Sequence, residues 1–304
     1  MQLPDLDELI QLRHQARGLS NSTAQQRVAT PLSGLYASVF RGQGMDFDEV
    51  REYREGDEIR QIDWRVTART GKPYLKVYRE ERERQVMLCV DASAPMHFGT
   101  QKNFKIVQAA KLAALLGWSA QGHGDRVGGV VCGQQHLQLF RPSPSAKSFL
   151  QLLRCLQTPP INASQYNLPY ALRALSQNSA TGALVFVISD FHHTDQAQLK
   201  TTLSQLRQQH EVVLIQLTDQ RDHTLPAMGK VSFHTASGEK ITIDTDDVTG
   251  QQHYQQHWET QQQQLQQLAS DFFMDLLNVT TNDDAYQCLL SGLRQRAHQQ
   301  HTHR

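Results

Sequence analysis

Two apolar segments that each lead into an aspartate constrain the fold of this chain more than any other feature of its sequence. Residues 86–90 read Val-Met-Leu-Cys-Val and are followed by Asp91. Residues 184–188 read Leu-Val-Phe-Val-Ile and are followed by Ser189 and Asp190. Short apolar runs of this kind are typical of strands that are buried on both faces of a sheet. We therefore expect two central strands, each with an acidic side chain at its carboxyl end.

The segments around these two strands alternate between helical and strand-like patterns. Helical spacing of apolar residues predicts helices over 5–18, 104–116, 146–156, 169–177, 195–209, 251–267 and 283–296, with Asp195 or Thr194 as a helix cap. Further strands are predicted over 127–131, 137–140, 211–217 and 272–279, and a hairpin over 231–243. This alternation indicates an α/β fold with a mostly parallel sheet flanked by helices, in which ligands bind outside the carboxyl ends of the strands.

Composition restricts the class of protein further. A chain of 304 residues can bury roughly 75% of its unfolded surface and needs no metal or disulfide to fold. Lys plus Arg and Asp plus Glu both number 30, so there is no cationic surplus of the kind that nucleic-acid binding requires. The four cysteines form no CxxC pair, and no apolar stretch approaches the ~18 residues of a membrane span. We expect a cytoplasmic protein without membrane insertion.

Motifs of common enzymes are missing from the sequence, which contains no P-loop, no GxGxxG after the first strand and no GxSxG. Asp91 and Ser93 could hold Mg²⁺ or Mn²⁺ through oxygen atoms, with Asp190 completing the shell through water. The other interpretation, which the spacing alone favours, is that they cap the helix that follows. Zinc is disfavoured at His192 and His193, because adjacent histidines rarely point the same way.

A block between residues 44 and 69 is dense in acids, arginines and aromatics. One interpretation is a docking surface for a partner protein, anchored by tryptophan and arginine. The other is an extended arm that arginine–carboxylate pairs lock onto the α/β core. The residues that would serve either role are Asp46, Asp48, Glu49, Arg51, Asp63, Trp64, Arg65 and Arg69.

The sequence resembles the family called domain of unknown function 58, whose members carry a von Willebrand factor A-like domain. The resemblance extends from about residue 30 to 295, and its N-terminal block is the most specific part. It is carried by residues 44–53, Gly56-Asp57, Arg60, 62–65, 67–69, 80–83 and 90–93, with later echoes at 124–128 and 189–191. The implied fold is a von Willebrand factor A-like (Rossmann-like) sheet with an N-terminal extended arm and a small β-hairpin addition.

The resemblance implies a metal-ion-dependent adhesion site with the pattern DxSxS. Asp91 and Ser93 match its first two ligands and Asp190 its late aspartate, but Pro95 replaces the second serine. The loop threonine falls on Tyr166, or on Ser164 in another register. The site is therefore expected to be degenerate.

The resemblance also implies a non-enzymatic module that binds a partner protein, with a MoxR-type AAA+ ATPase as the partner, in chaperone-like assembly or maturation. Loops at the top of the sheet, including Met96 and Phe191, would make the contact. A metal-dependent hydrolase using Asp91 and Asp190 is the alternative, and a purely structural subunit is a third.

Four segments are expected along the chain. An N-terminal helix and linker would occupy 1–30, and the family-signature arm would occupy 31–84 and pack on the core. The von Willebrand factor A-like domain would occupy 85–296, and a polar tail would follow at 297–304.

Overall fold

The structure is a computed structural model, and it describes nine parts of the chain. These parts are residues 3–21, 45–53, 62–80, 84–133, 137–157, 167–192, 195–223, 228–234 and 240–292. The chain divides into two compact units. The larger unit comprises Met1–Leu35 and Arg84–Arg304, and the smaller unit comprises Tyr36–Glu83.

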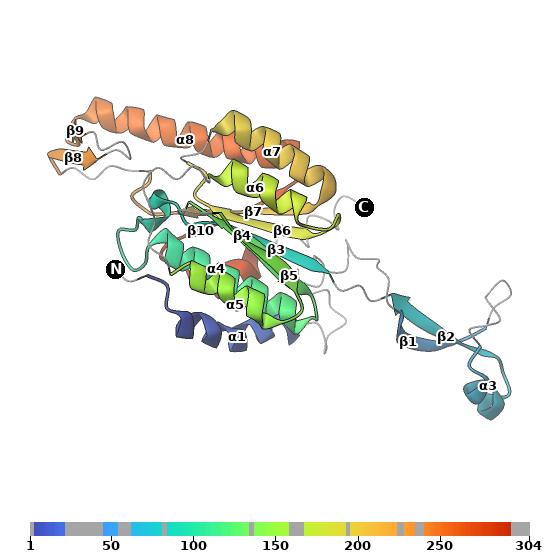
Figure 1. The fold of residues 1–304 in the computed structure, drawn as a ribbon. Helices are drawn as coiled ribbons and strands as arrows, with labels where there is room; N and C mark the ends of the chain where they lie inside the picture. The colour runs from blue at the N-terminus through green and yellow to red at the C-terminus, as the bar shows by residue number, and fades with distance from the viewer. Residues whose placement is uncertain are drawn as a thin grey trace. The chain divides into compact units, whose positions relative to one another are not determined.

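A six-stranded sheet forms the centre of the larger unit, with the strand order β10-β7-β6-β3-β4-β5 (Figure 1). Strand β5 pairs antiparallel with β4, and the other neighbouring strands pair in parallel. The strands are β3 (Gln85–Asp91), β4 (Arg126–Cys132), β5 (Gln138–Ser143), β6 (Leu184–Ser189), β7 (Glu211–Thr218) and β10 (Asp275–Thr280). The mostly parallel sheet expected from the alternating pattern is confirmed.

The point where the strand order reverses lies between β3 and β6. If these six strands are renumbered 1 to 6 along the chain, so that β3 is 1 and β10 is 6, their order in the sheet is 3-2-1-4-5-6. This is the order of doubly wound sheets, and the reversal is called the switch point. The chain leaves β3 towards one edge of the sheet and leaves β6 towards the other edge. Ligand sites of such sheets form in the crevice at this position, outside the carboxyl ends of the strands. Asp91 and Ser189 end these two neighbouring strands.

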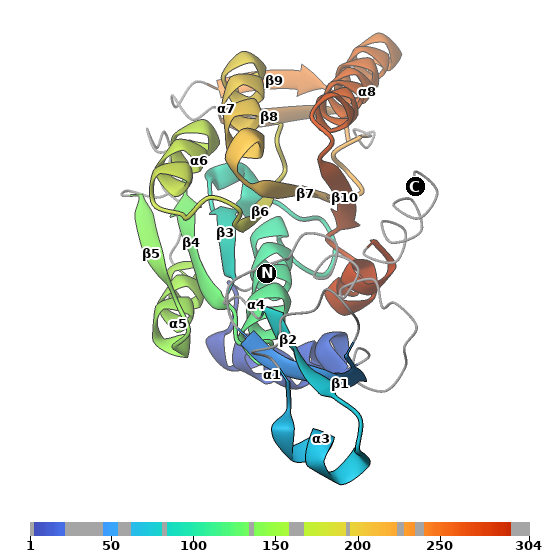
Figure 2. The same ribbon diagram turned by 90° about the vertical axis from the view of Figure 1, so that its right-hand side faces the viewer.

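Helices cover both faces of the sheet. Figure 1 shows α1, α4 and α5 on one face and α6, α7 and α8 on the other, and Figure 2 shows the same layers from the side. Their bounds are α1 (Leu6–Asn21), α4 (Lys105–Gly122), α5 (Ala146–Cys155), α6 (Leu168–Gln177), α7 (Gln196–Gln209) and α8 (Val248–Asp271). None of the described helices is long and apolar enough to cross a membrane.

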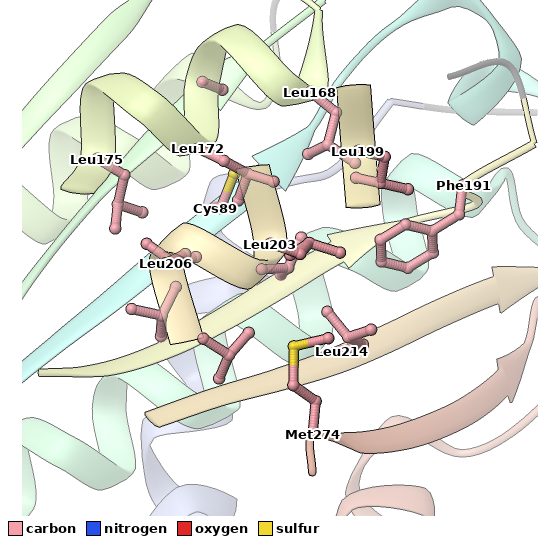
Figure 3. Packing of buried hydrophobic residues seen from close by; sticks show 14 of the residues in the cluster. Cys89, Leu168, Leu172, Leu175, Phe191, Leu199, Leu203, Leu206, Leu214 and Met274 are labelled. Carbon is pink, nitrogen blue, oxygen red and sulfur yellow. The ribbon is translucent and has the colours of Figure 1, made fainter. Parts of the chain in front are cut away.

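The core on the α6–α7 side is built from side chains of the strands and of these two helices (Figure 3). Leu172 and Leu175 of α6 and Leu203 and Leu206 of α7 are buried in it. Cys89 lies in the same core and is free, and burial raises the pKa of its thiol. Each fully buried leucine contributes about 1.5–3 kcal/mol, so the sheet edge is supported by a rigid layer.

The predicted N-terminal helix belongs to the larger unit, and it packs against α4. Leu9, Ala16 and Leu19 are buried, and the indole nitrogen of Trp118 in α4 donates a hydrogen bond of 2.9 Å to the carbonyl of Leu9. The helix therefore acts as part of the α/β core, whereas the sequence had suggested a separate segment of residues 1–30.

The C-terminal part of the larger unit contains the expected hairpin, helix and strand, but the bounds of the helix and of the strand differ from expectation. The hairpin of β8 (Lys230–His234) and β9 (Lys240–Asp244) forms as expected and leads into α8. The last strand was predicted from residue 272 but begins at Asp275. Phe273 occupies the preceding turn with a positive φ of 51° and is 86% exposed, so its apolar character misled the prediction.

The smaller unit contains a two-stranded antiparallel sheet and a short helix. Strand β1 (Met45–Glu52) pairs with β2 (Tyr74–Glu80), and α3 (Trp64–Thr70) lies between them in the chain. Asp63 caps α3 by accepting hydrogen bonds from the amides of Arg65 and Val66. The charged block is thus a hairpin with a helix, where an extended arm was expected.

Candidate functional site

Asp91 lies at the carboxyl end of β3 and is buried, with 6% of its surface exposed. Its Oδ1 accepts a hydrogen bond of 2.9 Å from the amide of Ser93, and its Oδ2 accepts one of 2.7 Å from the hydroxyl of Ser189. Ser189 ends the neighbouring strand β6, so this bond joins the two strands at the switch point. Both carboxylate oxygens of Asp91 are therefore engaged within the protein.

Ser93 follows Asp91 and stands at the N-cap position of a short 3-10 helix, η2 (Ala94–His97), where its side chain makes no capping hydrogen bond. The long helix α4 begins only at Lys105 and has Phe104 at its N-cap. The interpretation of Asp91 and Ser93 as side-chain caps of the following helix is therefore wrong. Gly133, at a φ of 81°, packs on Ser93, and a Cβ there would lie 2.3 Å from the Ser93 amide nitrogen.

Lys105 brings a positive charge into the site from the first residue of α4. Its Nζ lies 3.3 Å from Oδ2 of Asp190 and 2.8 Å from Oδ2 of Asp222. The side chains of Lys105 and Asp190 are each 3% exposed, and that of Asp222 is 13% exposed. A buried ammonium between two carboxylates satisfies charges that would otherwise be costly to bury. This cluster is held by contacts between residues far apart in the sequence.

Burial and charge change the pKa values of these groups in a consistent way. Burial, followed by the nearby charge of Asp190, raises the pKa of the Asp91 carboxyl, against the effect of hydrogen bonds from Ser93 and Ser189. Burial alone would lower the pKa of Lys105, but the carboxylates of Asp190 and Asp222 outweigh it and raise the pKa. Lys105 is thus held as a cation beside Asp190.

These residues do not fit a divalent metal ion. Such a cation needs several oxygen ligands, yet each carboxylate oxygen of Asp91 already accepts a hydrogen bond and Oδ2 of Asp190 faces the ammonium of Lys105. Pro95 offers no hydroxyl, and Tyr166 and Ser164 lie outside the described residues. The described parts of the chain contain no group of three or more His, Cys, Asp or Glu residues placed to hold a metal. The cation that contacts Asp190 is the ammonium of Lys105, at 3.3 Å.

A second aspartate fixes the loop that follows η2. Asp219, just beyond the end of β7, accepts hydrogen bonds from the amide of Thr100 at 3.1 Å and from the hydroxyl of Thr281 at 2.6 Å. Burial would raise the pKa of Asp219, but these hydrogen bonds outweigh it and lower the pKa. The loop of residues 97–104 is therefore tied to the ends of β7 and β10. The carboxyl edge of the sheet and the loops beside it form a rim, and these contacts preorganise it.

Two residues expected to contact a partner are instead buried. Met96 in η2 is 0% exposed, and Phe191 is 2% exposed. Figure 3 shows Phe191 within the core, in the neighbourhood of Leu199 and Leu214. Its φ of 59° and the hydrogen bond from its amide to the hydroxyl of Ser189 turn the ring inwards. Phe98, by contrast, has 44% of its surface exposed to solvent.

The expected contact residues of the smaller unit fall into two groups. Trp64 is 67% exposed, and Arg65 and Arg69 are also exposed, while Asp63 serves as the helix cap. Trp64 therefore does not pack into the interior of this unit. The side chains of Asp46, Asp48, Glu49 and Arg51 lie outside the described residues. Whether this unit docks a partner or braces the core stays a prediction.

Sequence reasoning missed Lys105, Asp222 and Ser189, which together complete the charge and hydrogen-bond network. One signal was present for Lys105, because it opens a mostly apolar helix at the end where the helix dipole disfavours a cation. A lysine in that position needs acidic partners. Asp222 gave no signal, because it lies in a polar loop 117 residues further along the chain.

The chain is similar to several known proteins. The chain is 29% identical over 216 residues to uncharacterized protein Rv1480 of Mycobacterium tuberculosis (strain ATCC 25618 / H37Rv), which covers 70% of this chain and 68% of the relative. Among solved structures, it is similar to the conserved hypothetical protein BatB from Bacteroides thetaiotaomicron, with 16% identity, a TM-score of 0.48 and coverage of 70% of this chain and 98% of BatB. It is also similar to a von Willebrand factor type A protein from Catenulispora acidiphila, with 9% identity, a TM-score of 0.41 and coverage of 72% and 43%.

The expected von Willebrand factor A-like α/β fold, with its six-stranded mixed sheet flanked by helices, is confirmed by the order and direction of the strands. Residues 49–264 match the family described as "Protein of unknown function DUF58". This match spans most of the chain and includes both units. The chain therefore belongs to the DUF58 family of proteins.

Proposed function

We propose that this chain is a non-enzymatic module that binds a partner protein through the carboxyl edge of its sheet, with Lys105 in place of a metal ion. The observation that carries the proposal is the Lys105 ammonium between Asp190 and Asp222 at the switch point of the sheet. It gives the rim a fixed internal cation, so that the loops around it are held without an external ligand. The partner is a MoxR-type AAA+ ATPase, as the family resemblance implies.

Binding accounts for the arrangement of the rim better than hydrolysis does. A hydrolase using Asp91 and Asp190 would need at least one of these carboxylates free to act as a base or to hold a catalytic metal. Instead, each carboxylate oxygen of Asp91 accepts a hydrogen bond from Ser93 or Ser189, and Asp190 is paired with Lys105. A rigid surface held by Asp219 and Thr100 suits recognition, because a preorganised loop loses little entropy on binding.

Site-specific photo-crosslinking tests which edge of the sheet meets the partner. The photoreactive analogue p-benzoylphenylalanine replaces Phe98 or Tyr170 at the rim, where these side chains are 44% and 48% exposed. The matched control is Phe273, which precedes β10 at the opposite edge of the sheet and is 86% exposed. The variants are expressed in the host, irradiated, and their adducts are identified by mass spectrometry.

We expect an adduct with an AAA+ ATPase at a rim position and none at Phe273. Equal adducts at both edges, or an adduct at Phe273 alone, would contradict binding through the rim. A specific rim adduct with another protein would keep the binding surface and overturn the identity of the partner.

A further inference from the structure

A cavity of about 220 Å³ opens beside the rim, between the charge cluster and helix α8. Lys105, Asp190 and Asp222 are its charged lining groups. Tyr254, His257 and Trp258 of α8 and His192 contribute rings. Pockets for drug-sized ligands have volumes of roughly 300–1,000 Å³. The smaller volume of this cavity therefore suits a single side chain better than a free metabolite.

The fixed charges of the cavity sum to a negative value. Lys105 contributes one positive charge, and Asp190 and Asp222 contribute two negative charges. The ammonium is closely paired with both carboxylates and is almost fully buried, while Asp222 keeps part of its surface exposed. An incoming anion would meet this excess of carboxylate, whereas a cation would find an acceptor on Asp222. The charge balance therefore selects a cationic group.

The aromatic wall favours the same kind of group. Trp258 lies in stacked orientation to His192, with ring centroids 6.4 Å apart, and His223 meets it edge-on at 5.4 Å. His192 is itself held by a hydrogen bond of 2.7 Å between its Nδ1 and the amide oxygen of Gln261. Tryptophan and tyrosine rings attract cations, and a guanidinium group can stack on them while donating to carboxylates.

The indole N–H of Trp258 adds a reason to expect a peptide. It is buried and has no hydrogen-bond acceptor among the described residues. An unpaired buried donor costs about 1–3 kcal/mol, so an acceptor supplied by a ligand would be favoured. A peptide offers this acceptor as a backbone carbonyl next to its basic side chain, and a free amine does not.

We propose that this cavity binds an arginine side chain of the partner protein, with its guanidinium group on Asp222 and against the aromatic wall of Trp258 and Tyr254. The inference rests on the proposed function, because it assigns a contact of the same rim. In a metal-dependent adhesion site, a cation bound to the domain would contact a carboxylate of the partner. Here the charges are reversed, because the partner would supply the cation and this chain the carboxylate.

Fluorine NMR of the full chain tests the proposal directly. The chain has three tryptophans, Trp64, Trp118 and Trp258, so that labelling with 5-fluorotryptophan gives three resonances, which single Trp→Phe variants assign. The probes are the peptides acetyl-Gly-Arg-Gly-amide, acetyl-Gly-Gln-Gly-amide and acetyl-Gly-Glu-Gly-amide. Trp118 of α4 is buried and donates a hydrogen bond to Leu9 of α1, so its resonance reports whether each variant is folded.

The arginine peptide is expected to shift the Trp258 resonance saturably while that of Trp118 stays in place, and the other two peptides should not reproduce this shift. Asp222→Asn keeps an oxygen acceptor for the Asp219 amide and removes the charge, and it should weaken binding about tenfold or more. The matched control is Glu259→Gln, which removes an acidic charge from the next residue of α8 outside the cavity and should leave the affinity unchanged.

Three results would overturn the inference. They are no Trp258 shift with the arginine peptide, an equal shift with the glutamine peptide, and equal weakening by Asp222→Asn and Glu259→Gln. The crosslinking at Phe98 separates this inference from the proposed function. A rim adduct without a Trp258 shift refutes the arginine site alone, and a Trp258 shift without a rim adduct refutes the proposed function alone.

Discussion

Replacing Lys105 by methionine should strongly destabilise the fold, because it removes the cation that neutralises buried carboxylates. Methionine keeps much of the volume of the lysine stem, so the packing of the α4 start is preserved. Asp190 would then remain 2% exposed with its Oδ2 facing no cation within the cluster. Breaking a buried ion pair by removing one partner costs about 3–5 kcal/mol. We expect a loss of this size in the free energy of unfolding.

Urea unfolding followed by circular dichroism measures the effect against a control on the same helix. Lys111 pairs with Glu8 at 2.8 Å, but their side chains are 21% and 49% exposed, so Lys111→Met should cost at most about 1 kcal/mol. Adding Asp190→Asn to Lys105→Met removes the uncompensated charge and should recover a large part of the loss. If Lys105→Met costs no more than Lys111→Met, or if the double variant recovers nothing, Lys105 is not the internal cation of the site.

Three further predictions follow from other parts of the structure. Magnesium or manganese should leave the melting temperature of the wild type unchanged in differential scanning calorimetry, and a saturable rise would show that the rim binds metal after all. Burial raises the pKa of Asp125 to about 6 from its ordinary 3.8. The folded state therefore binds this proton more tightly than the unfolded state does, so the stability from this group is full below about pH 4 and is lost as the pH rises through about 6. The free energy of unfolding should fall by about 3 kcal/mol over this range. Asp125→Asn should remove this fall in urea unfolding between pH 4 and pH 7, and an unchanged pH profile would contradict the assignment. Phe273 and Phe191 share a left-handed backbone, but Phe273 is exposed and Phe191 is buried. Phe273→Gly should therefore stabilise the protein by up to about 1 kcal/mol, because it relieves backbone strain. Phe191→Gly should destabilise it by about 3 kcal/mol or more, because core packing is lost. Changes of the same sign for both variants in chemical denaturation would refute this reasoning.

The sheet was predictable because its strands have strong local signals. The runs at 86–90 and 184–188 are continuously apolar, and each leads into an acidic residue, so both strands and the edge that carries Asp91 and Asp190 could be placed. The helix cap at Asp195 was equally local and is confirmed, with hydrogen bonds from the amides of Ala197 and Gln198. Patterns that arise within a few residues determine these features.

The internal chemistry of the site could not be predicted in the same way. Lys105 reaches Asp190 across 85 residues and Asp222 across 117, and no local pattern records which acid a lysine will meet. Phe191 and Met96 were placed at the surface because they sit in loops beside the site. The left-handed backbone at Phe191 turns its ring inwards, and Met96 faces inwards from a 3-10 turn. Side-chain direction in loops depends on such single dihedral angles.

The central claim is that the rim binds its partner by means of an internal cation and needs no metal. Its most direct test is capture of the partner identified by crosslinking, with the wild-type protein immobilised and the binding measured in buffer that contains either Mg²⁺ or EDTA. If the partner is an AAA+ ATPase, it is prepared free of nucleotide, so that the Mg²⁺ it needs for nucleotide binding does not affect the comparison of the two buffers. We predict equal affinity in the two buffers. Binding that disappears in EDTA and returns with added Mg²⁺ would contradict the account.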